Sequence, residues 1–394
     1  MIRIAHFGAY GLNLGDTVAI NNIRIQIEKH TNEQIEWVPL NIKEFHDVRN
    51  SIAVSNVIFG NKLKNIDALI IGGGGLVEAG PQHNEMGTGW KLPFSSQLFK
   101  RYNGEFPPIY IVGVGINYFR GYSSYEQFPE EARKNLINLV NRSRFASVRN
   151  DGSLEKIQQL LANNLEEYIN SPWENLIAEV PDPGLIYDYE IPRRTVKEAS
   201  TLVPAFQPAF NSNRKVMAGR GFKRVPEGQT SQRSVLNHFI KSNNLKILPH
   251  TPKDFRGFES DQLLLTKDYM RQNSGLDKYK NMLEFYNKIS CSIAMRGHGQ
   301  MIALALNVPS VYLSTQEKVL NFSQLHDLMD YNVDIKEKNW EKKLQIKLNK
   351  ICNDEQYRLN WYNKRDSLIT NFKKEFDHMC SHIIKDIEQL KRKK

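Results

Sequence analysis

The sequence predicts an α/β protein made of two doubly wound halves, each with a parallel sheet. Apolar strand-like segments alternate with helix-like segments along the chain, and this alternation is typical of parallel sheets. The 394 residues exceed one ordinary core, which favours two domains of roughly 150 to 200 residues. Breaker-rich residues 180–192 mark the boundary, so we expect domains at 1–190 and 191–345, followed by a basic helical segment at 346–394.

Each element follows from its local pattern. In the first half we expect strands at 1–7, 67–71, 109–114 and 145–148, with helices at 17–29 and 130–142. In the second half we expect strands at 245–250, 289–295 and 308–313, with helices at 263–271, 278–288 and 300–306. Ligands bind at the carboxyl ends of strands in such sheets, so two facing halves predict a cleft between them.

The last stretch differs from both halves. Its apolar residues recur at spacings of three and four, which predicts one long amphipathic helix: Leu368, Phe372, Phe376, Met379, Ile383, Ile387 and Leu390. Such a helix docks on a core. Because its polar face is basic, a helix lying in a membrane interface is the alternative.

Composition describes a soluble globular chain, with 40% hydrophobic and 24% charged residues. No apolar run approaches the roughly 18 to 20 residues of a membrane span, and the first residues read as a strand, so we expect a cytoplasmic protein. Cys291, Cys352 and Cys380 stand singly within strand or helix patterns, which favours buried reduced thiols.

The net charge of +10 is unevenly distributed. Residues 339–394 hold 14 Lys and Arg against 8 Asp and Glu, and the insert at 211–234 carries six basic residues against one acidic residue. Aromatic residues are not interleaved with these cations, which disfavours nucleic acid as a partner. An anionic small substrate or an acceptor at an anionic membrane surface fits better.

The strongest chemical signal is the turn Arg296-Gly297-His298, which follows an apolar strand and opens a small-residue helix. It puts a permanent cation and an imidazole beside the exposed N–H groups of a helix start, an arrangement that favours anions. Lys318 follows the next strand and returns a second cation to the same sheet edge.

Other strand ends add candidates. Asn13, Gly15 and Asp16 follow the first strand, where Asp16 could simply cap a helix. The run 72–75, with Gly73 and Gly74, predicts bare backbone beside a ligand or a strained turn without one. Arg149 and His250 each end a strand and could contact a ligand, although a surface arginine and a structural histidine are equally compatible with the pattern.

Two further groups are less specific. The loop at 78–90 contains His83, Glu85 and Trp90, which could shape the choice of a bound molecule. His378 and His382 have the i,i+4 spacing of metal ligands, but no third ligand is near in sequence, so no metal site is predicted.

Taken in order, several of these motifs resemble the polysaccharide pyruvyl transferase family over roughly residues 4 to 320. They are Asn13-x-Gly15-Asp16, the run 72–75, Ser147-x-Arg149-x-Asp151-x-Ser153, Pro181-Asp182-Pro183, and Arg296-Gly297-His298 with Val308-Pro309 and Lys318. The insert at 211–234 and the tail beyond about residue 335 lie outside the resemblance.

The resemblance implies a GT-B-like fold of two Rossmann-like domains facing across a cleft. It also implies phosphoenolpyruvate as donor, a sugar hydroxyl pair as acceptor, and a pyruvate ketal on a polysaccharide or cell-surface glycan as product, with no further cofactor. In such a family Arg296 and His298 bind the donor and support chemistry, and Asp16 and Lys318 are similarly implicated.

Residue chemistry agrees with these roles. Phosphoenolpyruvate carries a carboxylate and a phosphate, which Arg296 and Lys318 could hold with Arg149, His250 or Arg220. We expect His298 to protonate the enol carbon and Asp16 to act as base. The acceptor would then meet the first half, at a group comprising Asn13, Gly15, Gly73, Gly74, His83, Glu85 and Trp90.

Two other functions remain compatible with the sequence. A GT-B glycosyltransferase using a nucleotide sugar would also place a basic cleft between two glycine-edged halves. A non-catalytic protein of the same fold could bind a glycan or a membrane surface. The acceptor, possible lipid linkage and contact with the inner membrane face are not fixed by the sequence.

Overall fold

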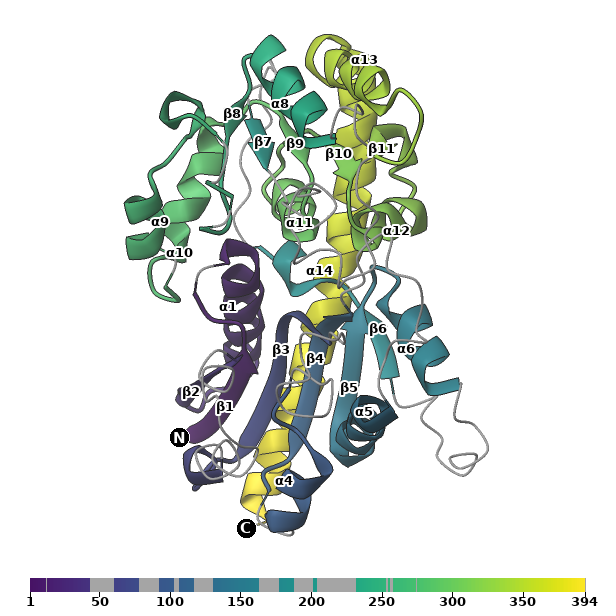
Figure 1. The fold of residues 1–394 in the computed structure, drawn as a ribbon. Coiled ribbons are helices and arrows are strands. Elements are labelled where there is room, and N and C mark those ends of the chain that lie inside the picture. Colours follow the sequence, from purple (N-terminus) through teal and green to yellow (C-terminus); the bar gives the residue numbers. More distant parts are fainter. Residues whose placement is uncertain are drawn as a thin grey trace.

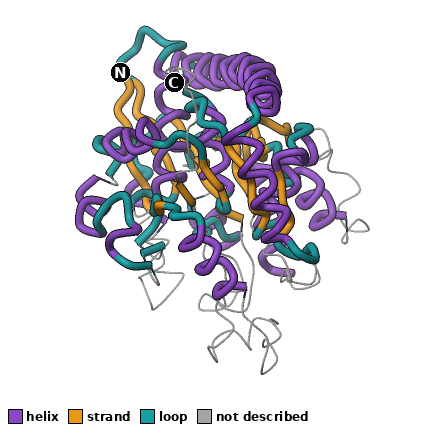
Figure 2. The backbone as a smooth tube through the Cα atoms, turned by 90° about the horizontal axis from the view of Figure 1, so that it is seen from above, coloured by secondary structure: helices purple, strands orange, loops and turns teal. Residues whose placement is uncertain are grey.

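The computed structural model describes residues 1–11, 13–42, 60–77, 92–102, 106–116, 130–162, 177–187, 201–203, 232–252, 254–255, 258–273 and 275–393. Over these ranges the chain forms two parallel sheets, one in each half, and a long C-terminal helix that passes along both (Figure 1). Viewed from above, helices flank the strands (Figure 2).

The first sheet has the order β2-β1-β3-β4-β5-β6, and all its neighbouring strands are parallel. Its strands are β1 (Ile2–Gly8), β2 (Ile35–Asn41), β3 (Ala68–Val77), β4 (Ile109–Ile116), β5 (Ser143–Arg149) and β6 (Ile177–Val180). The helices of this half are α1 (Leu14–Glu28), α4 (Ser96–Arg101), α5 (Glu130–Arg142) and α6 (Ser153–Ala162).

The second sheet has the order β11-β10-β9-β7-β8 and is also parallel. Its strands are β7 (Thr201–Val203), β8 (Lys246–Ile247), β9 (Ser292–Ala294), β10 (Ser310–Ser314) and β11 (Asn332–Asp334). The α-helices are α8 (Gln232–Ser242), α9 (Lys267–Asn273), α10 (Tyr279–Leu283), α11 (Gly297–Ala305), α12 (Glu317–Leu325) and α13 (Trp340–Asn353). Short 3₁₀ turns are η4 (Pro183–Leu185), η7 (Ser260–Gln262), η8 (Glu284–Lys288) and η9 (Met329–Tyr331).

Both sheets are wound in the same way. If the strands of each half are numbered from one in chain order, both sheets have the strand order 2-1-3-4-5, and the first sheet has a sixth strand after the fifth. In the second sheet this order runs from β8 to β11. The winding therefore reverses between β1 and β3 in the first half and between β7 and β9 in the second. Ligands of open α/β sheets bind outside the strand ends at such reversals. The predicted α/β class with two parallel halves is confirmed.

The glycine run at 72–75 gives the bare backbone that the sequence predicted, and the strained turn that was its alternative is wrong. Strand β3 continues through it to Val77 and pairs with β4. A Cβ atom at Gly72 would lie 2.3 Å from the carbonyl oxygen of Val112, and one at Gly73 would lie 2.4 Å from Ile20 of α1. The glycines are required because β4 and α1 pack directly against this backbone.

Several element limits also differ from the predictions. The strand expected at 289–295 is shorter in the structure, where β9 covers Ser292–Ala294. The helix expected at 300–306 begins at Gly297, and the one expected at 263–271 begins at Lys267. Strands β2, β6, β7 and β11 and helices α4, α8 and α12 were not predicted, and α13 lies partly within the helical segment expected at 346–394.

The last helix is α14 (Glu355–Arg392), whose first turn is capped by the Asp354 carboxylate accepting from the Tyr357 N–H group at 3.0 Å. Its buried apolar residues join a core that also contains Ile4 of β1 and Ile293 of β9. The predicted docking helix is thus confirmed, and protein covers the face that a membrane would have needed. Within the described residues, no helix is long and apolar enough to cross a membrane.

Polar contacts fasten α14 to both halves. On the first half, Asp386 accepts from the Tyr110 hydroxyl at 2.7 Å and pairs with Arg144. On the second half, the buried guanidinium of Arg365 donates to the carbonyl oxygens of Leu304 and Ala305 at 2.7 and 2.8 Å. A cation therefore holds the C-terminal end of α11, which the helix dipole favours.

The cysteines are free, buried thiols, as the sequence predicted. Cys291 and Cys352 lie close together, with 3.4 Å between their Sγ atoms.

Arg365→Met should lower the free energy of unfolding by about 2–3 kcal/mol, because buried carbonyl groups at the end of α11 lose a charged hydrogen-bond donor. Urea unfolding followed by circular dichroism measures the change. Lys364→Met is the matched control, since Lys364 pairs with Asp327 at the surface and should contribute less than about 1 kcal/mol. Equal effects of the two changes would contradict the anchoring role.

Candidate functional site

The two halves meet where α1 and α11 begin. A methyl group at Gly15 would lie 2.1 Å from the Cβ atom of His298, so α1 presents bare backbone to this imidazole. The Leu14 N–H group donates to the His250 carbonyl oxygen at 3.0 Å, which links the start of α1 to the second half. Glycine is therefore required at position 15 by the close approach of the halves.

His298 is 5% exposed and lies among groups from both halves. Its Nδ1 atom is 3.3 Å from Asp16 Oδ1, while its Nε2 atom is 3.3 Å from Arg149 Nη1 and 3.6 Å from Asp182 Oδ2. A guanidinium can only donate, so a neutral His298 accepts at Nε2 and carries its proton on Nδ1, toward Asp16. A second proton on Nε2 would face Asp182.

Arg149 stands at the end of β5 and is 1% exposed. Its guanidinium lies 2.9 Å from Asp182 and 3.2 Å from Asp151, and it occupies space that a side chain at Gly115 would fill. Burial alone would raise the pKa of Asp182, but the charges of Arg149 and His298 hold that pKa well below its usual range. The guanidinium is thereby compensated and fixed beside His298.

Arg296 is held by Asp254, with 2.7 Å between Nη2 and Oδ1. Asp254 also accepts from the N–H groups of His250 and Thr251, at 3.0 and 2.8 Å. Burial raises the pKa of Asp254, and the charge of Arg296 opposes that rise. The guanidinium of Arg296, the cap residue of α11, is therefore held in place by a carboxylate that is itself fixed by two backbone N–H groups.

His250 is fully buried, and its Nε2 atom lies 2.8 Å from the Tyr286 hydroxyl. Burial and the positive charges of Arg296 and His298 lower its pKa well below the ordinary value. The structure thus places a neutral His250 behind Arg296.

Lys318 lies on α12, with its side chain against the backbone of Gly297. Burial lowers the pKa of Lys318 to about 8, as does the charge of Arg149, while Asp151 and Asp16 act in the opposite direction. Its amine therefore changes charge close to physiological pH.

Asp16 lies in the first turn of α1, not at its cap, because the helix begins at Leu14 and Asn13 occupies the cap position. The Asn13 amide donates to Asp16 Oδ2 at 2.5 Å, leaving Oδ1 toward His298. A Cβ atom at Gly74 would lie 3.1 Å from that same oxygen, so Gly74 borders the carboxylate. Gly73 instead packs against Ile20.

The structure thus brings together five residues that the sequence singled out: Asp16, Arg149, Arg296, His298 and Lys318. Four other predicted residues lie beside them: Asn13, Gly15, Gly74 and His250. Arg220, His83, Glu85 and Trp90 lie outside the described residues. Within the described ranges, no three His, Cys, Asp or Glu side chains are grouped to hold a metal ion.

Sequence reasoning missed three acids of this cluster. Asp182 and Asp151 entered only as members of motifs, and Asp254 not at all. Asp151 and Asp182 lie directly after β5 and β6, so the rule that selected Arg149 applies to them once β6 is known, whereas Asp254 lies well beyond the end of β8. With Asp16 they give four carboxylates against the three cations of Arg149, Arg296 and Lys318, and a protonated His298 would balance the charge.

Gly15→Ala should displace His298 from Asp16, because the added methyl group overlaps the imidazole carbons. We expect the ¹⁵N-labelled imidazole signals of His298, assigned with a His298→Ala variant, to shift or broaden. Overpacking should also destabilise the fold by about 1–3 kcal/mol, partly offset by the better helix propensity of alanine. Asn21→Ala on the same helix is the control, and unchanged His298 signals in Gly15→Ala would contradict this geometry.

The sequence model of the polysaccharide pyruvyl transferase family matches residues 13–317. No curated protein sequence matches the chain.

Among solved structures, the chain is similar to Staphylococcus aureus MnaA with UDP, at 13% identity over 91% of this chain and 90% of that one, with a TM-score of 0.48. It is also similar to the Methanocaldococcus jannaschii UDP-GlcNAc 2-epimerase, at 12% identity over 90% and 94% of the two chains, with a TM-score of 0.43. The Phytolacca americana UGT2 apo structure is 9% identical over 98% and 100% of the two chains, with a TM-score of 0.44.

Proposed function

Because the chain belongs to the polysaccharide pyruvyl transferase family, we propose that it moves a pyruvyl group from phosphoenolpyruvate onto two hydroxyls of a glycan sugar, forming a pyruvate ketal. The observation that carries the proposal is the position of His298. It contacts Asp16 of the other half on one nitrogen and the Arg149–Asp182 pair on the other. An imidazole held in this way can move a proton at a fixed place.

In this proposal the donor anion binds at the start of α11. The first N–H groups of that helix lack partners within it, Arg296 occupies its cap position, and the Lys318 side chain lies against Gly297. Arg149 is almost fully buried and its Nη1 atom lies 3.3 Å from His298 Nε2, so its task in this proposal is to orient His298. His250 supports the site by bracing Arg296 through Asp254. Any contribution of Arg220 would add a further cation.

The reaction then proceeds in two additions. His298 protonates C3 of the enol, which makes C2 electrophilic, and the first sugar hydroxyl forms a bond to C2 while its proton passes to Asp16. The C2–O bond to phosphate then breaks, and the second hydroxyl closes the ketal as its proton leaves with inorganic phosphate. The contact of Asp16 with His298 Nδ1 gives a short route for returning a proton to the imidazole.

The acceptor belongs to the same proposal. A glycan would approach from the side of Asn13, Gly15 and Gly74, with His83, Glu85 and Trp90, which follow β3 in the sequence, as further candidate contacts. A lipid-linked glycan would bring the enzyme to the inner membrane face, where its basic regions favour anionic lipid. The proposal includes no further cofactor and a reaction in the cytoplasm.

His298→Ala and Arg296→Ala should each reduce phosphate release from phosphoenolpyruvate by at least about 100-fold, because one removes the acid and the other a donor-binding cation. The measurement is a phosphate-release assay against a panel of free and lipid-linked glycans. His378→Ala and Arg271→Ala change exposed residues elsewhere and should retain full turnover.

Retained turnover in both site variants would contradict the assignment. Thermal unfolding gives an independent check, because a ligand that binds only the native state raises the unfolding temperature. We expect stabilisation by phosphoenolpyruvate. Stabilisation by UDP or GDP alone would instead indicate a nucleotide-sugar enzyme.

The charge of Lys318 should set the alkaline limit of the enzyme's activity. Below its pKa of about 8 the ammonium attracts the donor, and above it the neutral amine does not, so kcat/KM for phosphoenolpyruvate should fall as pH rises through about 8. Lys318→Arg keeps its charge and should move this fall to higher pH. An identical pH profile in both proteins would show that another group causes the limit.

A further inference from the structure

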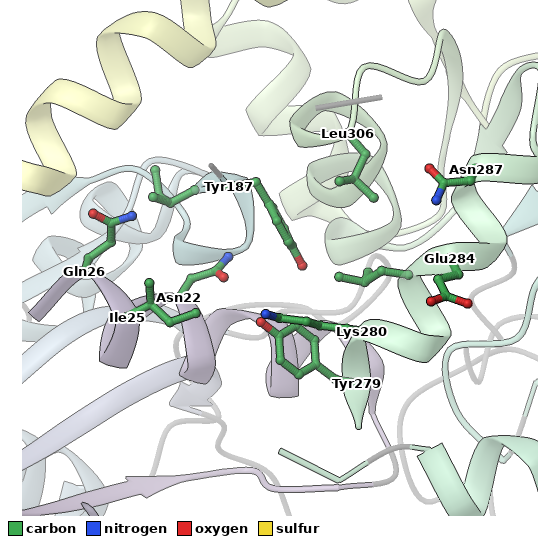
Figure 3. Close-up of a pocket in the computed structure, with 11 residues that line it drawn as sticks. Asn22, Ile25, Gln26, Tyr187, Tyr279, Lys280, Glu284, Asn287 and Leu306 are labelled. Carbon is green, nitrogen blue, oxygen red and sulfur yellow. The ribbon is translucent and has the colours of Figure 1, made fainter. Parts of the chain in front are cut away.

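A cavity lies between the two halves, lined by residues other than those of the candidate site. It has a volume of about 390 Å³, and its wall is formed by α1, the segment after η4, and the region from α10 to η8 (Figure 3). This volume falls within the range of small-molecule pockets.

The cavity and the candidate site share the same interdomain elements. Gly15 of α1 touches His298, and Asn22, two turns further along α1, lines the cavity. Helix α11 begins at the site and is followed directly by Leu306, another lining residue. At 1.5 Å per helical residue, the seven residues from Gly15 to Asn22 span about 10 Å. The cavity and the candidate site are therefore neighbours along the same interface between the two halves.

The lining combines apolar surface with several hydrogen-bonding groups. Ile25, Leu283 and Leu306 are apolar, and the rings of Tyr187 and Tyr279 add flat amphipathic faces. Amide groups come from Asn22, Gln26 and Asn287, and Lys280 and Glu284 contribute opposite charges. With no net charge in its lining, the cavity does not favour an anion. A pure hydrocarbon would leave its polar groups without partners.

Tyr187 is the most informative of these residues. It is 9% exposed, and its hydroxyl has no hydrogen-bond partner among the described residues. Figure 3 shows its ring extending into the cavity from the side opposite Lys280 and Tyr279. A buried hydroxyl without a partner costs free energy, which a ligand bearing a hydroxyl or carbonyl group would recover.

We infer that this cavity binds one sugar unit of the glycan acceptor, at a distance from the sugar that reacts. A sugar ring has apolar C–H faces for the tyrosines and hydroxyl groups for the amides and the Tyr187 hydroxyl. The inference rests on the proposed function for the identity of its occupant. Because both halves form the wall, a bound sugar would also hold α1 against α10 and support the contact of Asp16 with His298.

Tyr187→Phe tests the hydroxyl without leaving a void. The probes are methyl glycosides of neutral hexoses and of N-acetylhexosamines at millimolar concentrations, followed by ligand-observed NMR and calorimetry. We expect at least one glycoside to bind the wild-type protein, and Tyr187→Phe to weaken it by roughly tenfold, the loss of one hydrogen bond. Ile25→Trp, a change at a partly buried position, should fill the cavity and abolish binding.

Tyr312→Phe is the matched control. Tyr312 is buried in the second sheet, where its hydroxyl accepts from Trp361, and its loss should leave glycoside binding unchanged. Absence of saturable binding by every glycoside, or binding that survives both Tyr187→Phe and Ile25→Trp, would overturn the inference. Phosphate release is measured separately: Tyr187-dependent glycoside binding without pyruvyl transfer to any glycan of the panel would contradict the proposed function and leave a sugar-binding cavity whose glycan is not a pyruvyl acceptor.

Discussion

The charge of one buried guanidinium constrains the whole site. Arg149 is almost fully withdrawn from water, and an uncompensated buried charge costs several kcal/mol. Asp151 and Asp182 must therefore stay beside it, and Asp182 in turn fixes η4 by accepting from the Gly184 N–H group at 2.7 Å. His298 then has a single place to lie, between this pair and Asp16.

The sequence predicted the class of fold and most of the residues at the site, for a physical reason. Parallel strands bring their carboxyl ends to one edge, so Arg149, Arg296, His298 and Lys318 could be grouped without coordinates. Partners that come from distant segments could not be found in this way. The glycine run was recognised as bare backbone, but the neighbours that require it, β4 and α1, are tertiary contacts that local patterns do not contain.

Strand order also lay beyond the sequence. Local periodicity identifies a strand but not its neighbours, so the shared winding of the two sheets emerged only from their pairing. The same holds for Arg365, a charged residue within an amphipathic helix pattern. Its partners are backbone carbonyls of α11, which no side-chain pattern reports.

Asp16 and His298 belong to different halves and meet only because Gly15 lets α1 approach α11 so closely. In the proposed reaction the acid and the base would be separated whenever the halves move apart. An open molecule could then load its donor without being able to activate it. Hydrolysis of the donor without transfer would then be suppressed, because Asp16 and His298 would be in contact only when α1 and α11 are together. In that closed arrangement water would also be excluded from the space between the halves.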